Sequence, residues 1–192
     1  MNIICSDNEI SIRLLEKTEK DIKYIYNCLN DKNVNKYYGD SKEKSFDYVK
    51  QKYESKIDDD KTYPCIIEYN KENIGYVQFY SINNIDYELT QEQFAKIADN
   101  SSNIYAIDIF IADAEYRDKG IGTRILKLLN NTLFERYNAD VIVIDPKTNN
   151  LRAIACYKKC GFKECFIAEK REEIDGTRYD NLIMKIEKRW RT

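Results

Sequence analysis

The sequence predicts a mixed α and β domain, in which a mixed but mainly antiparallel sheet of about seven strands carries helices on both faces. Three observations predict this class. Short apolar strand patterns alternate with segments of helical periodicity along the chain. Residues 141–144 are apolar at every position, as in a parallel strand buried on both faces. Only 6 Gly and 2 Pro occur in 192 residues, without a linker or internal repeat, so residues 1–192 form a single domain.

The first part of the chain predicts one strand followed by two helices. Residues Ile10–Leu15 alternate like a strand, and Thr18 caps a helix with an apolar face. A second helix covers Phe46–Ile57 and ends at the acidic run Asp58–Asp60. We interpret this run as solvated charge at a helix end, and attraction of a cation is the alternative.

The middle of the chain predicts a hairpin and an insert. Two strands, Tyr63–Tyr69 and Ile74–Tyr80, are joined by a turn at residues 70–73. Residues Ile82–Asn103 form an irregular polar insert, in which a short helix is expected at Gln91–Ala98.

A strand, a helix and a second strand are expected next. Ile104–Ile111 is an apolar strand pattern, and Ile121–Arg136 has helical periodicity. The buried parallel strand Val141–Ile144 is bounded by Asp145-Pro146.

The chain ends with a helix and a hairpin. The helix covers Asn150–Cys160 and is closed by Gly161 at its C′ position. The last two strands, near Phe162–Ile174 and Arg178–Ile186, meet at Asp175-Gly176, which is a strong hairpin signal.

Composition and charge exclude several classes of function. The 31 Lys and Arg residues nearly balance the 33 Asp and Glu residues, and the net charge of −2 disfavours general nucleic-acid binding. No apolar stretch approaches the length of a membrane span, and residues 1–5 do not resemble a signal peptide. We therefore expect a cytoplasmic protein without nucleic-acid or membrane partners, either a monomer or a homodimer.

Cysteine and histidine usage limits the chemistry. The 6 cysteines show no framework spacing and are interpreted as reduced thiols. Cys156 and Cys160 are four residues apart on an expected helix, which is one spacing of a metal pair. With no histidine and no CxxC motif, we expect no metal site. A general base must then be Asp, Glu, Tyr, Cys, Lys, a terminal amine or a relayed water, and a histidine-based triad is excluded.

The stretch Arg117–Gly122 has the features of a phosphate cradle. It contains basic residues and two glycines where a strand passes into a helix. Glycine permits a positive φ and a close approach of the backbone, and the free N–H groups of a first helical turn attract anions. An ordinary turn between a strand and a helix is the alternative.

Two motifs together resemble the GCN5-related N-acetyltransferase (GNAT) superfamily. Its pyrophosphate motif, Gln/Arg-x-x-Gly-x-Gly/Ala, matches Arg117, Gly120 and Gly122. Its later motif, Asn-x-x-Ala-x-x-x-Tyr-x-Lys-x-Gly-Phe, matches Asn150, Ala153, Tyr157, Lys159, Gly161 and Phe162. The resemblance covers essentially the whole chain and implies the GNAT fold, with acetyl-CoA as the cosubstrate and no metal.

Within this superfamily the sequence looks most like the aminoglycoside 6′-N-acetyltransferases, including the acetyltransferase half of the bifunctional resistance enzyme. The segments that carry this resemblance are 37–39, 66–70, 74–76, 119–124, 145–146 and 149–154.

The resemblance implies a binding site for acetyl-CoA along one strand and two helix starts. Backbone N–H groups of 119–123 would hold the pyrophosphate, with Arg117 and Arg124 as charges. For Arg124 a solvated helix residue is the alternative, and for Asn150 helix capping is an additional role. The residues expected to bind the cosubstrate are Phe110, Ile111, Arg117, Lys119, Gly120, Ile121, Gly122, Thr123, Arg124, Asn150 and Ala153.

Two catalytic residues follow from the same resemblance. Asp108 is a lone carboxylate in an apolar strand, at the position where the aminoglycoside enzymes carry their proposed base. Tyr157 is at the place of the usual proton donor to the leaving thiolate. A strand-edge Asp108 that faces water and a core Tyr157 are the alternatives. In some relatives this tyrosine only positions the sulfur, which is a further alternative for Tyr157. Negative charge on the acetyl oxygen would be stabilised by a backbone N–H near Phe110.

The acceptor pocket is expected to combine carboxylates with aromatic walls, because an aminoglycoside carries several ammonium groups. The alternatives are a turn-forming role for Asp175 and solvated loop charge for Asp86 and Glu88. The residues assigned to this pocket by the resemblance are Tyr38, Asp86, Glu88, Asp145 and Asp175.

The sequence departs from the family pattern at two positions. The resistance enzymes usually have Gln after the base, where this chain has Ile109, and often a second Gly where it has Asp40. Neither change prevents acetyl transfer. The sequence thus predicts an N-acetyltransferase for the 6′-amine of aminoglycosides, by direct transfer in a ternary complex. The alternatives are another acceptor (a polyamine, an amino sugar or a protein N-terminus) and a non-catalytic acetyl-CoA-binding protein.

Overall fold

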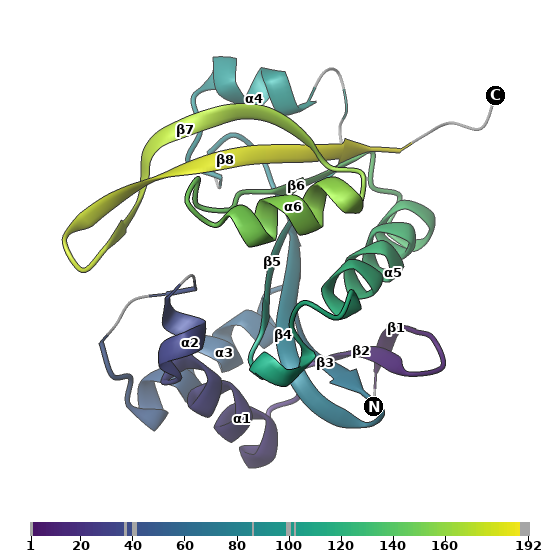
Figure 1. Ribbon diagram of the computed structural model, residues 1–192, viewed down its shortest axis with the longest axis vertical. Helices are drawn as coiled ribbons and strands as arrows, with labels where there is room; N and C mark the ends of the chain where they lie inside the picture. The colour runs from purple at the N-terminus through teal and green to yellow at the C-terminus, as the bar shows by residue number, and fades with distance from the viewer. Residues whose placement is uncertain are drawn as a thin grey trace.

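The computed structural model describes residues 2–36, 38–39, 42–85, 87–98, 101 and 103–188. Its central feature is an eight-stranded sheet in the order β1-β2-β3-β4-β5-β6-β8-β7 (Figure 1). The strands are β1 (Ile3–Ser6), β2 (Ile10–Leu14), β3 (Thr62–Tyr69), β4 (Glu72–Ser81), β5 (Ile104–Ile111), β6 (Val141–Ile144), β7 (Lys163–Ile174) and β8 (Thr177–Glu187). The α-helices are α1 (Glu19–Leu29), α2 (Lys32–Asn35), α3 (Phe46–Asp58), α4 (Gln91–Ala98), α5 (Ile121–Arg136) and α6 (Leu151–Lys159).

The mixed class and the mainly antiparallel pairing are confirmed. Among the described strands only β5 and β6 pair in parallel, and every other neighbouring pair is antiparallel. The structure has one strand more than the sequence indicated, because β1 is too short for its pattern to be recognised. No helix among the described residues is long and apolar enough to cross a membrane.

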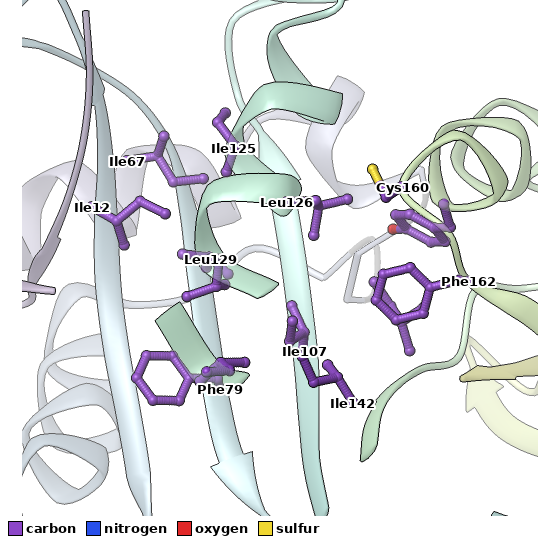
Figure 2. Close-up of a cluster of buried hydrophobic side chains, with 14 of the residues drawn as sticks. Ile12, Ile67, Phe79, Ile107, Ile125, Leu126, Leu129, Ile142, Cys160 and Phe162 are labelled. Atoms are coloured by element: carbon purple, nitrogen blue, oxygen red, sulfur yellow. The ribbon is translucent and has the colours of Figure 1, made fainter. Parts of the chain in front are cut away.

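Helices cover both faces of the sheet, as expected. On one face, α5 and α6 pack over residues of β2 to β6, and Figure 2 shows Ile125, Leu126 and Leu129 of α5 in this core. On the other face, α1 and α3 cover Ile66, Tyr76 and Phe110. A separate cluster on that face joins α4 to Ala106, Val141 and Val143. The two clusters on the second face leave a gap between them, where Asp108 lies between Ala106 and Phe110 in β5.

The sheet opens beside this gap. β5 pairs with β6 only over Ile104–Ala106, whereas its pairing with β4 continues to Ile111. Strand residues after Ala106 therefore have no partner in β6. Backbone groups alternate in direction along a strand, so every second residue of 107–111 turns its N–H and C=O towards the open edge.

Candidate active site

A cleft of about 760 Å³ lies where β5 and β6 separate. This volume is in the range typical of small-molecule sites. Residues from the second face of the sheet, such as Lys56, Gln78 and Asp108, line one part of it. Residues from α5 and α6, such as Thr123 and Tyr157, line the other. The cleft therefore joins the two faces through the open edge of β5.

The first turn of α5 forms an open anion cradle. Gly120 is the N-cap residue, with φ 79°, and makes no side-chain capping bond. A left-handed conformation of this kind favours glycine. A Cβ on Gly120 would contact nothing within 4 Å, so the space before the helix is open. The N–H groups of 121–123 lack helical partners, as in any first turn, and an oxygen-rich anion such as a pyrophosphate fits them.

The two arginines expected to add charge to this cradle have different surroundings. Arg117 lines the cleft, but its Nε and Nη2 donate to the Ile111 carbonyl oxygen at 3.0 and 2.8 Å, and Nη2 also donates to Ala112. Burial lowers the pKa of this guanidinium. Arg117 thus fastens the end of β5 to the turn before α5.

The contacts of Arg124 favour the alternative to a role in the cradle. Its guanidinium pairs with Glu9 at 2.7 Å and with Asp7 at 3.0 Å, and it does not line the cleft. The solvated helix residue is the better interpretation. Lys119 and Ile121 also lie outside the lining, so only their backbone N–H groups remain candidates. Two cations on α6, Arg152 and Lys159, line the cleft instead. Both lie in segments that carry the family resemblance, but neither was assigned to the site from the sequence.

Asp108 lies in a hydrogen-bonded polar chain and does not face bulk water at a strand edge. Gln78, its partner in the β4–β5 register, donates from Nε2 to Asp108 Oδ2 at 2.5 Å. The Gln78 Oε1 accepts bonds from Lys56 Nζ at 2.5 Å and from the Tyr76 hydroxyl at 2.7 Å. The amide of Gln78 thus links the carboxylate to a half-buried cation, with Asp108 itself lining the cleft.

Burial sets the proton affinity of this carboxylate. It raises the pKa of Asp108 from 3.8 to about 6, and the negative charge of Asp145 adds to the increase. The Gln78 hydrogen bond and the Lys56 charge oppose it. A base with a pKa near 6 is mostly ionised at neutral pH, yet binds a proton more strongly than an exposed aspartate.

The backbone donor expected near Phe110 lies on its neighbours. The Ile82 N–H donates to the Ile104 carbonyl oxygen, and the Ala112 N–H donates to the Ile74 carbonyl oxygen. These bonds lie at the two ends of the β4–β5 pairing, and they fix which residues of β5 turn their backbone groups towards β4. The register between them has no shift. Alternation then directs the N–H of Phe110 towards β4 and those of Ile109 and Ile111 towards the open edge. The N–H groups near Phe110 that face the open edge are therefore those of Ile109 and Ile111.

Tyr157 and Asn150 come from α6, on the other side of the open edge. Tyr157 is buried and lines the cleft. Burial raises the pKa of the Tyr157 phenol, and the charge of the nearby Cys156 adds to the increase. The hydroxyl therefore keeps its proton at neutral pH. Asn150 caps α6 by accepting a hydrogen bond from Ala153 N at 3.3 Å, and both residues line the cleft.

The residues predicted for the acceptor pocket are partly brought together. Tyr38, Glu88 and Asp145 line the cleft. Tyr38 packs edge-on against Phe110, with ring centroids 4.8 Å apart. Asp175 is exposed at the tip of the β7–β8 hairpin, with φ 50°, and is not among the cleft residues. Its turn-forming role is therefore the better interpretation. Asp86 and Asp40 lie outside the described residues.

Asp145 has a partner that the sequence did not indicate. Arg171 of β7 donates from Nε to Asp145 Oδ2 at 2.8 Å, so this carboxylate is not an open ammonium site. Glu172 also lines the cleft, 3.9 Å from Lys147. These contacts depend on strand pairing between distant segments, which no local pattern in the sequence shows. No group of three or more potential metal ligands occurs among the described residues.

Cys156 has an environment unlike that of the other described cysteines. Its Sγ lies in the cleft wall, 3.4 Å from Thr123 Oγ1 at the start of α5. Hydrogen bonding from Cys160, then from Thr123, and the charges of Lys159 and Arg152 lower the pKa of Cys156. By contrast, burial raises the pKa of Cys165, which is exposed to a similar degree.

We therefore expect iodoacetamide at pH 7 to alkylate Cys156 at least about tenfold faster than Cys165, because the thiolate is the reactive form. Peptide mass spectrometry after short exposures measures the two rates. Cys160→Ala should slow the labelling of Cys156 and leave Cys165 unchanged. Equal rates at both sites in the unmodified chain would contradict the expectation.

Comparisons with known proteins agree on a family. The family model described as acetyltransferase (GNAT) domain matches residues 17–169. Aminoglycoside N(6′)-acetyltransferase type 1 of Klebsiella pneumoniae is 29% identical over 160 residues, which cover 82% of this chain and 76% of that protein. Spermidine N(1)-acetyltransferase of Vibrio cholerae is 25% identical over 159 residues, covering 82% and 81%.

Solved structures show the same fold. Aminoglycoside acetyltransferase AAC(6′)-Ib in complex with coenzyme A and kanamycin superposes with a TM-score of 0.69 at 24% identity, covering 93% of this chain and 94% of that one. Spermidine N-acetyltransferase from Vibrio cholerae in complex with CoA and spermine gives 0.74 at 23% identity, covering 94% and 96%. Since the family model spans most of its length, this chain belongs to the GNAT acetyltransferases.

Proposed function

We propose that this acetyltransferase modifies the 6′-amine of aminoglycosides, by direct transfer from acetyl-CoA in a ternary complex. The observation that carries the proposal is Asp108, a carboxylate of raised pKa beside the open edge of β5, within one cleft that also includes the α5 cradle. The aminoglycoside relatives named above support the choice of acceptor. The coenzyme A in the solved neighbours supports the cosubstrate.

Acetyl-CoA supplies a thioester whose carbonyl carbon accepts an amine. The N–H groups of 121–123 would hold its diphosphate, with Arg152 and Lys159 as the nearby cations. The N–H groups of Ile109 and Ile111 would orient the pantetheine arm along the open edge and donate to the acetyl oxygen. The arm would then lie between Asp108 on one face and Tyr157 on the other.

Two side chains would move protons. The acceptor amine reaches the site mainly as an ammonium ion, and Asp108 takes a proton from it at Oδ, so that the nitrogen lone pair is free. The Tyr157 hydroxyl donates a hydrogen bond or a proton to the departing sulfur. The Gln78 amide fixes the orientation of Asp108, and Lys56 keeps it ionised.

A thiol-release assay tests the proposal. With acetyl-CoA, kanamycin should release free CoA thiol, whereas an aminoglycoside with a hydroxyl at the 6′ position should not. Mass spectrometry should find one added acetyl group on the 6′-nitrogen of kanamycin. Equal turnover of the two drugs, or none, would contradict the 6′-amine as acceptor.

A polyamine is the second candidate acceptor, favoured by the spermidine acetyltransferases among the relatives. Spermidine in the same assay separates the two. Turnover of spermidine with a higher kcat/KM than that of kanamycin would assign the polyamine. Binding of acetyl-CoA in a calorimeter with no turnover of any amine would indicate a binding protein.

A further inference from the structure

A salt bridge between two lining residues, Arg171 and Asp145, forms part of the cleft wall. Arg171 and Asp145 pair at 2.8 Å, with side-chain exposures of only 13% and 18%. The guanidinium carbon of Arg171 also lies over the Tyr87 ring, 4.4 Å from its centroid, and Nη1 approaches the Glu88 carbonyl oxygen at 3.5 Å. Arg171 is thus held on three sides at the wall of the acceptor pocket.

A bulge in β7 brings Arg171 to this position. The pairing of β7 with β8 shifts register between Ala168 and Glu172, and Lys170 has φ 50°. A bulge re-aims a side chain relative to the regular pleat of the strand. Lys170 N donates to Asp180 Oδ1 at 2.8 Å, which ties the bulge to β8. The location of Arg171 is therefore determined by the backbone.

The surroundings of this salt bridge are rich in hydrogen-bond acceptors. Asn181 donates from Nδ2 to the Asp145 carbonyl oxygen at 2.7 Å. Its buried Oδ1 accepts no hydrogen bond from any described residue, although Asn181 lines the cleft and is 5% exposed. Glu172 is 3.9 Å from its cation, Lys147, which is a loose pair. An ammonium group carries three donors and would satisfy acceptors of this kind.

The pKa values of the two carboxylates in this part of the cleft, Asp145 and Glu172, lead to the same conclusion as the shortage of hydrogen-bond donors. Burial raises the pKa of Asp145 even though Arg171 opposes the shift. Burial also raises the pKa of Glu172, and the charge of Asp145 adds to it. Burial thus disfavours the charged forms of both carboxylates more than Arg171 and Lys147 favour them. A further cation in this part of the cleft would favour the charged forms.

We propose that Arg171 is a tethered competitor for a substrate ammonium group at Asp145, and that it sets how strongly the enzyme prefers polycationic acceptors over monoamines. The inference rests on the proposed function for the identity of the acceptor. An acceptor with a second ammonium group must displace Arg171 Nε from Asp145 or share the carboxylate with it. A monoamine that reacts at Asp108 has no second ammonium group to compete for Asp145, so Arg171 should change its binding much less.

Arg171→Met tests this proposal, because Met keeps an unbranched chain over Tyr87 without the charge. At pH 8, the KM of kanamycin should fall by at least about tenfold, and that of 6-amino-6-deoxyglucose, a monoamine, by less than about threefold. Arg171→Lys should restore most of the original ratio between the two KM values. A structural role alone would change both KM values alike, and that outcome, or a weaker binding of kanamycin, would overturn the proposal.

Calorimetry keeps the test independent of turnover. Kanamycin and spermidine are titrated into the wild-type chain and into the Arg171→Met and Arg171→Gln variants, each after a thermal melt has confirmed folding. Tighter binding of either polycation to both variants supports the competitor, even if neither compound is acetylated by the wild type. Absence of turnover alone would reject only the proposed acceptor. Unchanged affinities for both polycations would reject the role of Arg171.

Discussion

Replacement of Asp108 by Asn should lower kcat by about 10²- to 10⁴-fold, while the affinity for acetyl-CoA stays within about twofold. Asn keeps the size of the side chain and one oxygen that can accept from Gln78, but it cannot take a proton from the acceptor ammonium. The α5 cradle, which would bind the cosubstrate, is formed by other residues. Steady-state kinetics with kanamycin and calorimetry with acetyl-CoA measure the two quantities separately.

The same variant should be no less stable than the wild type at pH 7. The pKa of Asp108 is raised from 3.8 to about 6 in the folded chain, so its ionised form opposes folding. The favourable contribution of the neutral form is complete below pH 3.8 and is lost as the pH rises through 6. At pH 7 the carboxylate is mainly ionised, and a neutral amide removes that unfavourable charge. A loss of rate without a loss of stability then identifies a chemical role.

The pH dependence of kcat/KM gives a further readout of Asp108. Because the base must be ionised, the wild-type value should fall with decreasing pH below about 6, following the raised pKa of Asp108. The residual activity of Asp108→Asn should lack this step. Asp58→Asn, at the exposed end of α3, is the matched control and should retain both rate and profile. An unchanged kcat in Asp108→Asn would remove Asp108 from the mechanism.

Local patterns predicted the elements that carry the site. The bounds of β5, α5, β6 and α4 agree with the expected ranges 104–111, 121–136, 141–144 and 91–98. Each of these elements has a hydrophobic periodicity, or a residue that marks its start or end, within its own segment. Such signals can be recognised without knowing how the rest of the chain folds. The position of Asp108 in β5 and of Gly120 before α5 follows from the same local information.

The contacts that surround these residues could not be predicted in the same way. Gln78 reaches Asp108 through the β4–β5 register, across 30 residues of sequence. Arg171 reaches Asp145 because a bulge in β7 turns it inward, and no composition signal marks that bulge. The ion pairs of Arg124 could not be predicted for the related reason that its partners, Asp7 and Glu9, lie 117 and 115 residues away. Nonlocal pairing therefore determines which charges the cleft contains.

The second prediction with a large expected effect concerns the stability of the fold. It involves a charged side chain that is buried outside the cleft. Arg13 of β2 is 2% exposed. Its Nη1 and Nη2 donate to the two carboxylate oxygens of Asp21 in α1 at 2.7 and 2.9 Å, and its Nε donates to Glu68 of β3 at 2.7 Å. The Glu16 N–H also donates to Asp21 at 3.0 Å. This group fixes the first turn of α1 against the sheet.

Arg13→Met should lower the free energy of unfolding by about 3–5 kcal/mol, because it leaves the Asp21 carboxylate buried without its cation. Urea denaturation monitored by circular dichroism measures the change. Lys17→Met is the matched control, since Lys17 pairs with Asp58 at exposures of 43% and 66%. Exposed pairs contribute less than about 1 kcal/mol, so this variant should unfold almost as the wild type does.

A variant in which Arg13, Asp21 and Glu68 are replaced together by Met, Leu and Leu separates two explanations of that loss. If the cost comes from an unpaired buried charge, the triple variant should recover most of the stability, since no charge then remains to be desolvated. If it comes from lost packing of α1 on β2, the triple variant should be as unstable as Arg13→Met. A loss below about 1 kcal/mol in Arg13→Met would show that water reaches Asp21 and that the charge is not buried in solution.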